Sequence, residues 1–277
     1  MGMRINTNQM AVNAQRNLRA NQSSLQGSTE KLSSGQRINK SADDAAGLAI
    51  SEQLHATIRS FQQAGRNAQD GISFVQVAEG GMNEVGNMII RLRELSVQAA
   101  SDTVGDRERG YLNNEVQQLK LEINRIAQGT EFNGTRLLDG NGQKLDFQIS
   151  VHNDDFLDRI SYEPNKTNVT LDALGLSNID VASKTGAQGG LDSLDNSLAV
   201  LNANRAELGA LQNRLFSTIA NTEVAIENFS AAKSRIRDTD MSVVSADLAK
   251  DTVKTQASTS VLAQANQSTA MALKLLG

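Results

Sequence analysis

The chain has 277 residues, of which 21% are charged and only 3% aromatic, with one proline and no tryptophan or cysteine. The absence of cysteine excludes disulfides, thiolate metal sites and a cysteine nucleophile. The formal net charge of -4 does not supply the basic surface that binding to nucleic-acid phosphates requires.

Helices are the expected elements of such a chain, because alanine and leucine are among the better helix formers and bulky aromatic core residues are scarce. No stretch approaches eighteen consecutive apolar residues, and the N-terminus has no apolar region typical of a secretory signal. We therefore predict no membrane span and no cleaved signal peptide.

The first predicted helix, from about residue 5 to 34, has a narrow apolar stripe. Its apolar residues recur at intervals of seven, the spacing of a coiled-coil seam: Ala11, Leu18, Leu25 and Leu32. The seam positions between them are small or polar: Ala14, Asn21 and Ser28. This helix therefore needs a partner to be stable.

A loop signal follows in the sequence LSSGQRINKSADDAAGLAI, residues 32–50. Gly35 is typical of a helix C-terminus, where glycine adopts the left-handed conformation. Asp43 and Asp44 are an adjacent carboxylate pair that could serve as a general acid and base, but helix N-termini favour the same residues for capping, and we favour capping. The segment is predicted to be a joint between two helical parts.

Three further helical stripes are predicted between this joint and residue 236. The first runs from Leu54 to Ala99 and would be on the order of 80 Å long. The second runs from Leu112 to Ile126, after a turn at Gly105, and the third from Leu191 to Ile236. Three antiparallel helices around a shared seam would make a rod.

Residues 131–188 change character and are predicted to form hairpins and loops. Asn133-Gly134 is a turn pair, and Leu145, Phe147, Ile149 and Val151 alternate with polar residues. GAQGG at 186–190 matches no complete phosphate-binding fingerprint, so we interpret it as a flexible hinge before the last rod helix.

The C-terminal segment, from about residue 241 to 275, repeats the seven-residue spacing of the first helix. Its repeat consists of Met241, Leu248, Thr255, Leu262, Thr269 and Leu276, flanked by Val244, Ala265 and Leu273. Because single helices are marginal in water, we predict that the two terminal stripes pair as a coiled coil. The polar seam positions predict that this coiled coil is poorly stable as a monomer.

The fold class that follows is mainly α, a long antiparallel helical rod with a terminal coiled coil and a small β-hairpin region. We predict one domain from residues 1–44 plus 237–277 and a second from 45–236. No catalytic, metal or cofactor site is predicted. His55 and His152 have no triad or ligand spacing around them, and the HNDDFLD run lacks the pattern of a calcium loop.

Long stretches of the sequence closely resemble bacterial flagellins. They are INTNQMAVNAQRNL, LSSGQRINKSADDAAGLAI, AGRNAQDGISFVQVAEGGMNEV, RLRELSVQAA, TEFNGTRLLDG and VLAQANQSTAMALKLLG. The resemblance covers residues 1 to about 140 and 190–277, and the short middle suggests a minimal flagellin. It implies a subunit that polymerises into the flagellar filament, the helical propeller of swimming motility.

The resemblance also implies partners and sites. The subunit would assemble with itself or with sister flagellins, and would meet the filament cap and hook-filament junction proteins. It would be exported to the extracellular flagellum through the flagellar type III apparatus, with a cytosolic chaperone binding Leu248, Leu262, Leu273 and Leu276. The residues expected to bridge to neighbouring subunits at the joint are Arg37, Lys40, Asp43 and Asp44.

Flagellins are also recognised by a host Toll-like receptor through the helix around RLRELSV. The matching positions are Arg91, Leu95 and Glu115, with the charged pair on an exposed face and Leu95 as an apolar anchor. The same face could instead pack against adjacent subunits. Two other functions stay open at this point, a hook-filament junction protein and a non-polymerising coiled-coil adaptor.

Overall fold

The structure, a computed structural model, describes residues 8–274 and the side chains of residues 8–267. Its contacts form two compact units. The terminal unit is built from both ends of the chain, up to Ile58 and from Asn228 onward, and the rod unit spans Arg59–Glu227. The domain boundaries predicted near residues 44 and 237 stay a prediction.

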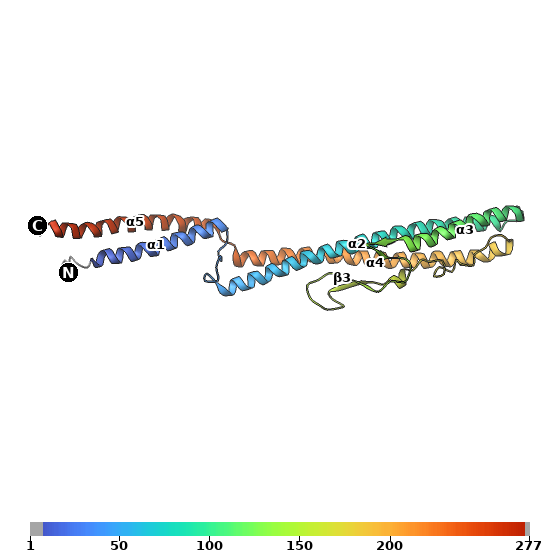
Figure 1. Ribbon diagram of the computed structural model, residues 1–277, viewed down its shortest axis with the longest axis horizontal. Helices are drawn as coiled ribbons and strands as arrows, with labels where there is room; N and C mark the ends of the chain where they lie inside the picture. Colours follow the sequence, from blue (N-terminus) through green and yellow to red (C-terminus); the bar gives the residue numbers. More distant parts are fainter. Residues whose placement is uncertain (1–7, 275–277) are drawn as a thin grey trace. The chain divides into compact units, whose positions relative to one another are not determined.

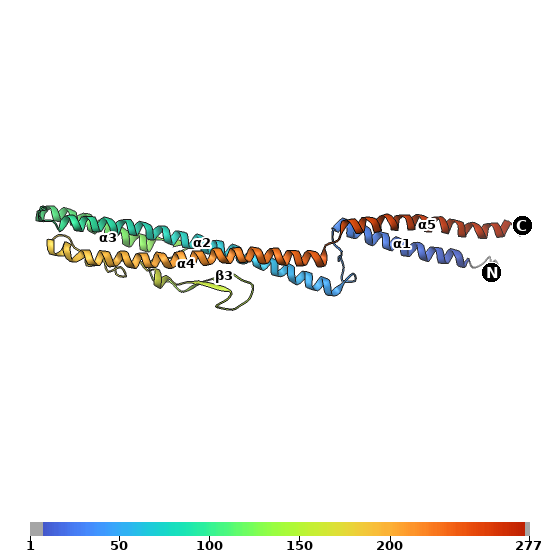
Figure 2. The same ribbon diagram turned by 180° about the vertical axis from the view of Figure 1, so that it is seen from behind.

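Two long helices make up most of the terminal unit, α1 (Gln9–Ser34) and α5 (Met241–Lys274). They lie side by side and run antiparallel, as both views show (Figure 1, Figure 2). Each begins at a residue whose side chain accepts backbone N–H groups: Asn8 accepts from Ala11, and Asp240 accepts from Ser242. The predicted pairing of the two ends is confirmed.

Three helices contribute to the rod unit, α2 (Ala45–Ala99), α3 (Asp106–Gly129) and α4 (Lys184–Arg237). Figure 1 shows α3 and α4 running alongside α2. The predicted apolar stripes face inward along this unit; among the fully buried side chains are Val85, Leu92, Ile123, Leu201 and Leu215. The predicted fold class, a mainly helical rod with a terminal coiled coil and small hairpins, is confirmed.

Two small hairpins pack on the helices of the rod unit. The first pairs β1 (Glu131–Phe132) with β2 (Thr135–Arg136), and the second pairs β3 (Leu145–Gln148) with β4 (Arg159–Tyr162). At the predicted turn, Asn133 and Gly134 both have positive φ, 49° and 76°, as a two-residue hairpin turn needs. The strand predicted through Val151 is shorter, because the chain bends after Ile149 into a loop closed by Asp158, whose carbonyl accepts from the Ile149 N–H.

The hinge predicted at residues 186–190 is wrong, because these residues lie inside α4. Gly186 allows close packing there, because a Cβ at this position would lie 2.6 Å from the Asp180 carbonyl oxygen. A Cβ on Gly190 would lie 3.6 Å from Ile179, which is an ordinary contact. Gly186 thus lets the first turn of α4 pack directly against residues 180–183.

Four aromatic rings hold both hairpins on α2. The Phe74 ring is 5.7 Å from that of Phe132 in β1, 5.5 Å from Phe147 in β3 and 4.8 Å from Tyr162 in β4, each in an edge-to-face arrangement. The Tyr162 hydroxyl donates to the Leu137 carbonyl at 2.6 Å, and burial raises the pKa of this hydroxyl to about 12. In an aromatic-poor chain, this cluster fixes the β region on the rod unit.

Candidate subunit-packing surfaces

The α1–α5 seam is only partly closed in the single chain. The seam leucines are half-buried: Leu18, Leu25, Leu32, Leu248 and Leu262. Among the side chains of the pair that the structure describes, the buried apolar ones are few and small, namely Ala14, Val244 and Ala265. Other large apolar side chains of the pair face outward: Met10, Val12, Met241, Val243, Val253 and Val261 are 50–70% exposed. The pair therefore keeps apolar surface that a second partner could cover.

Polar seam positions of α1 and α5 contact each other. Asn21 Nδ2 donates to Ser258 Oγ at 2.6 Å, and Ser28 Oγ donates to Asp251 Oδ2 at 3.0 Å. Asp251 is 8% exposed, and Lys254 lies 3.7 Å away on the next turn. Asn21 and Ser28 are seam positions that the heptad spacing of α1 predicts, whereas Asp251 was not predicted. Its signal was the seven-residue spacing from Val244 through Asp251 and Ser258 to Ala265.

The predicted helix end at Gly35 is confirmed. Gly35 has φ 68°, and its N–H donates to the Lys31 carbonyl. The segment that follows returns to the other end of the chain: Arg37 N donates to the Arg237 carbonyl at 2.7 Å, and Arg37 Nη2 donates to the Ile236 carbonyl at 2.7 Å. Arg237 itself contacts Glu52 and Gln36. Within one chain, Arg37 therefore binds backbone.

The two aspartates of this segment hold its backbone. Asp44 Oδ1 accepts from Gly47 N at 2.9 Å, which is the predicted cap at the start of α2. Asp43 Oδ2 accepts from the N–H groups of Lys40 and Asn39, both at 3.0 Å, and these bonds hold the pKa of the Asp43 carboxyl below its ordinary value. Asp43 and Asp44 thus shape the joint, while Lys40 forms an exposed ion pair with Glu30 that raises the pKa of the Lys40 ammonium.

The structure corrects one residue of the predicted receptor patch. Arg91 on α2 pairs with Glu115 on α3 at 2.9 Å and with Glu94 at 3.0 Å, and all three side chains are exposed. Leu95 is only 1% exposed, because it faces the core of the rod unit together with Leu92. The expected apolar anchor is therefore a core residue, and the exposed patch is purely polar at these positions.

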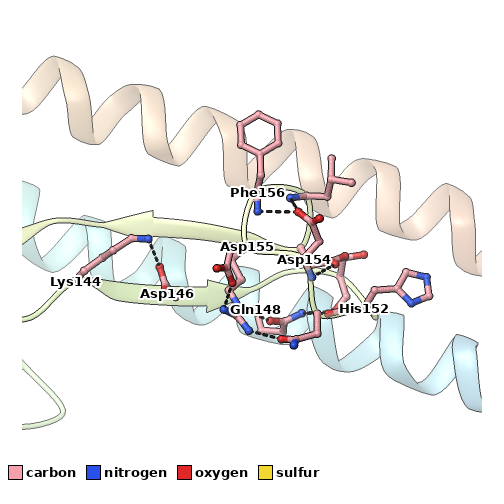
Figure 3. Close-up of polar contacts among 12 residues, drawn as sticks. Lys144, Asp146, Gln148, His152, Asp154, Asp155 and Phe156 are labelled. Carbon is pink, nitrogen blue, oxygen red and sulfur yellow. Dashed lines mark hydrogen bonds and ion pairs between the residues drawn. The ribbon is translucent and has the colours of Figure 1, made fainter.

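The HNDDFLD run forms a loop between β3 and β4 that is closed by hydrogen bonds from its own backbone to its carboxylates (Figure 3). Asp154 Oδ1 accepts from the N–H groups of Phe156 and Leu157, and Asp158 Oδ2 accepts from Asp154 N. Asp154 and Asp158 are thus occupied by backbone donors, and Asp155 pairs with the Arg159 guanidinium. Within residues 8–267 no group of three acidic or histidine side chains is arranged to hold a metal ion. The loop leaves Phe156 86% exposed and Leu157 70% exposed, which the sequence did not predict.

No helix within residues 8–274 combines the length and apolar character needed to cross a bilayer. His55 lies beside Glu52, 3.9 Å away, and the backbone carbonyl of His152 accepts from Gln148.

Comparison with known proteins agrees with this architecture. The family described as the bacterial flagellin N-terminal helical region matches residues 5–143, and the bacterial flagellin C-terminal helical region matches residues 191–276. A flagellin of Halalkalibacterium halodurans is 44% identical over 276 residues, covering 99% of this chain and 100% of that protein.

Two solved structures share the fold. The crystal structure of Bacillus cereus flagellin aligns with a TM-score of 0.51 at 27% identity, covering 57% of this chain and 88% of that one. A Vibrio parahaemolyticus protein described as a flagellar hook-associated protein aligns with a TM-score of 0.58, covering 71% of this chain and 100% of that one. At 12% identity, the second likeness shows the fold alone. Sequence identity along nearly the whole chain and both family regions agree: the chain belongs to the bacterial flagellin family.

Proposed function

We propose that this flagellin builds its filament by burying the α1–α5 pair against the same pair in other copies. As a member of its family, the chain is a structural protein, a subunit that polymerises into the bacterial flagellar filament outside the cell. The observation that carries the proposal is the seam itself: the leucines remain half-buried and the outward valines and methionines exposed when α1 and α5 are already paired.

Burial of this remaining apolar surface would drive assembly. A helix pair with few buried side chains gains little from its own packing, so ordering it costs more free energy than one chain recovers. Contacts with further copies supply the missing burial, and folding of the ends is then coupled to polymerisation. The hydroxyl and amide groups along both helices can hydrogen-bond laterally in such a packed core.

At the joint, we assign subunit contacts to the exposed cations. Arg37 and Lys40 carry their charge on exposed residues, whereas Asp43 and Asp44 are occupied by backbone donors within the chain. The two aspartates therefore contribute to subunit packing indirectly, by fixing the backbone conformation of the joint. Arg37→Glu should impair polymerisation, and unchanged filament growth in this variant would refute the role of Arg37.

Export of the subunit and its capture before assembly are further parts of the proposal. We propose passage through the flagellar type III apparatus, and a cytosolic chaperone that covers the apolar positions of the C-terminal helix until export. Leu248 and Leu262 are half-buried on α5 and are suited to such a contact. Leu273 lies in α5 beyond the described side chains, and Leu276 lies outside the described residues. The filament cap and hook-filament junction proteins would be further partners, and sister flagellins could share the filament.

Recognition by a Toll-like host receptor is a further proposal, now restricted to Arg91 and Glu115. Both are exposed, but they already pair with each other across α2 and α3, so a receptor would have to bind the pair or compete with it. Arg91→Ala and Glu115→Ala should weaken receptor binding while leaving the fold intact. Leu95→Ala would act through the core instead.

The proposed assembly is tested by electron microscopy of purified protein seeded with filament fragments. The full chain should grow filaments, and a chain lacking residues 1–34 and 241–277 should not. Filaments from the truncated chain would refute the role of the α1–α5 pair. A full chain that stays monomeric with both ends helical would instead favour the coiled-coil adaptor, and short assemblies that never elongate would favour a junction protein.

A further inference from the structure

The polar contacts in the α1–α5 seam follow one register. From Asn21 to Ser28 is seven residues forward in α1, and from their partners Ser258 to Asp251 is seven residues back in α5. The next step outward along both helices places Ala14 beside Ala265, both of which are buried. The two hydrogen bonds therefore belong to one continuous set of antiparallel layers.

Apolar layers lie between these polar layers. The same register places Leu18 near Leu262, Leu25 near Thr255 and Leu32 near Leu248, and all six side chains are half-buried. Leucines repeated at intervals of seven can be exchanged by a slip of seven residues with little change in packing. The apolar layers alone thus do not select one register.

A slip by one repeat would replace the two polar layers by one in either direction. In one direction, Asn21 would face Asp251, but Ser28 would face Val244 and Ser258 would face Ala14. In the other, Ser28 would face Ser258, but Asn21 would face Ala265 and the buried Asp251 carboxylate would face Gly35. Each slip therefore leaves two hydrogen-bonding side chains against residues whose side chains cannot pair with them, which disfavours it.

We propose that the Asn21–Ser258 and Ser28–Asp251 layers, the register layers, lock α1 and α5 of the flagellin subunit in a single register. This inference rests on the proposed function, in which the pair packs against other copies. A slip of seven residues would move one helix along the other by about 10 Å. The outward apolar residues of α1 and α5 would then no longer form one surface for neighbouring copies.

Engineered cysteine pairs measure the register in assembled filaments, because the natural chain has no cysteine. Leu25→Cys with Thr255→Cys reports the register of the structure, and Leu25→Cys with Leu248→Cys or with Leu262→Cys reports the two slips. After mild oxidation, intrachain disulfides change the gel mobility of the monomer, whereas links between chains give dimers. With the register layers intact, only the first pair should form the intrachain link.

The same pairs are then placed in a chain in which all four register residues are alanine: Asn21→Ala, Ser28→Ala, Asp251→Ala and Ser258→Ala. Slipped intrachain links should now appear beside the unslipped one, since removing the polar layers leaves repeats of similar packing. The unslipped link should stay the most abundant, because the Arg37 N–H still bonds the Arg237 carbonyl at the joint. Unslipped links alone in this background would overturn the proposal.

A partner exchange tests the Ser28–Asp251 layer without depending on the alanine background. Ser28→Asp places two carboxylates face to face and should slow seeded filament growth at least tenfold. Adding Asp251→Ser exchanges the two partners and should restore growth to within about twofold of the natural chain, since the layer again pairs one hydroxyl with one carboxylate. Ser60→Asp, an equal charge change at an exposed position of α2 in the rod unit, is the matched control and should leave growth unchanged.

An exchange variant that grows no faster than Ser28→Asp alone would overturn the inference. The proposed assembly function would be refuted by a different result, namely filament formation by the truncated chain. Filaments that depend on the chain ends but tolerate loss of the register layers would leave the function standing and remove only the register lock.

Discussion

Single carboxylates shape the irregular segments of this chain by accepting backbone N–H groups. Asp43, Asp44 and Asp154 do so in the joint and in the β3–β4 loop. The sequence analysis considered two of these groups as an acid and base pair, and the structure shows carboxylates whose oxygens are already occupied. Carboxylates occupied in this way stabilise the local structure, and at Asp43 the two backbone bonds also hold the pKa of the carboxyl below its ordinary value.

Asp158 gives this effect a measurable pH dependence. The Asp154 N–H, 2.8 Å from Asp158 Oδ2, holds the pKa of the Asp158 carboxyl below its ordinary value of 3.8, and the Ser150 hydroxyl assists. A lowered folded-state pKa means that the loop is fully stabilised above about pH 4 and loses this stabilisation as the pH falls through the folded-state pKa. We expect the loop to open in acid and Asp158→Asn to remove most of that dependence.

Pepsin cleavage at the exposed Phe156–Leu157 bond measures loop opening between pH 4 and 2. The rate should rise more steeply with acid in the natural chain than in Asp158→Asn, after correction with a free peptide of the same sequence. Circular dichroism establishes that the rod helices stay folded over this range. Equal slopes for the two proteins would show that Asp158 does not control the loop.

At the scale of the element, the adjacent glycines of α2 differ in their surroundings. A Cβ on Gly80 would meet no atom within 4 Å, whereas one on Gly81 would lie 2.7 Å from Thr130 Oγ1 and 2.8 Å from Leu138 Cδ1. Gly80→Ala should therefore stabilise the chain by about 0.5–1 kcal/mol through helix propensity. Gly81→Ala should destabilise it by about 1–3 kcal/mol through overpacking.

Urea unfolding of the monomer, followed by the helical signal, compares the two variants. Each serves as the control for the other, because both add one methyl group to the same turn of the same helix. An equal increase in the free energy of unfolding for both variants would contradict this prediction. It would mean that Thr130 and Leu138 can move away from α2 at little cost.

The aromatic cluster predicts a second difference between elements. Phe74 is 4% exposed and contacts rings from both hairpins, so Phe74→Ala should cost about 3–5 kcal/mol of unfolding free energy. Phe216→Ala on α4 removes the same ring from a site that is 51% exposed and should cost much less. Denaturant midpoints of the two variants measure this, and equal losses would contradict an anchoring role for Phe74.

Elements with strong local signals could be predicted from the sequence. The heptad leucines from Leu18 onward and the Asn133-Gly134 turn encode their structure within a few residues, and both were predicted correctly. The helix at Gly186 was not predicted, because glycine was interpreted as a sign of flexibility. Here Gly186 allows a close contact with the Asp180 carbonyl, which only the folded structure shows. Asp251 and Ser28 are 223 residues apart in the sequence, so no local sequence pattern predicts the hydrogen bond between their side chains. Leu95 was wrongly predicted to lie on an exposed face, because a sequence motif does not show which face of its helix is buried.

At the scale of the whole molecule, burial is distributed unevenly between the two units. The fully buried apolar side chains described in the terminal unit are Ala14, Ile38, Ile58, Val244 and Ala265, while the rod unit holds a continuous core from Ala68 to Leu215. Because buried apolar area supplies most of the stabilising free energy, the two units should differ strongly in local stability. Assembly should remove that difference.

Hydrogen exchange, resolved by peptide, tests this expectation in one chain under two conditions. In the monomer, amides of α1 and α5 should exchange on the order of 100-fold or more faster than those of α2 around Met82, because opening the terminal unit exposes little apolar surface. In seeded filaments the same α1 and α5 amides should become protected, while exchange near Met82 changes little and serves as the internal reference. Strong protection of α1 and α5 already in the monomer would mean that the pair is stable by itself, and polymerisation would then have to be driven by surfaces of the rod unit such as the exposed loop at Phe156.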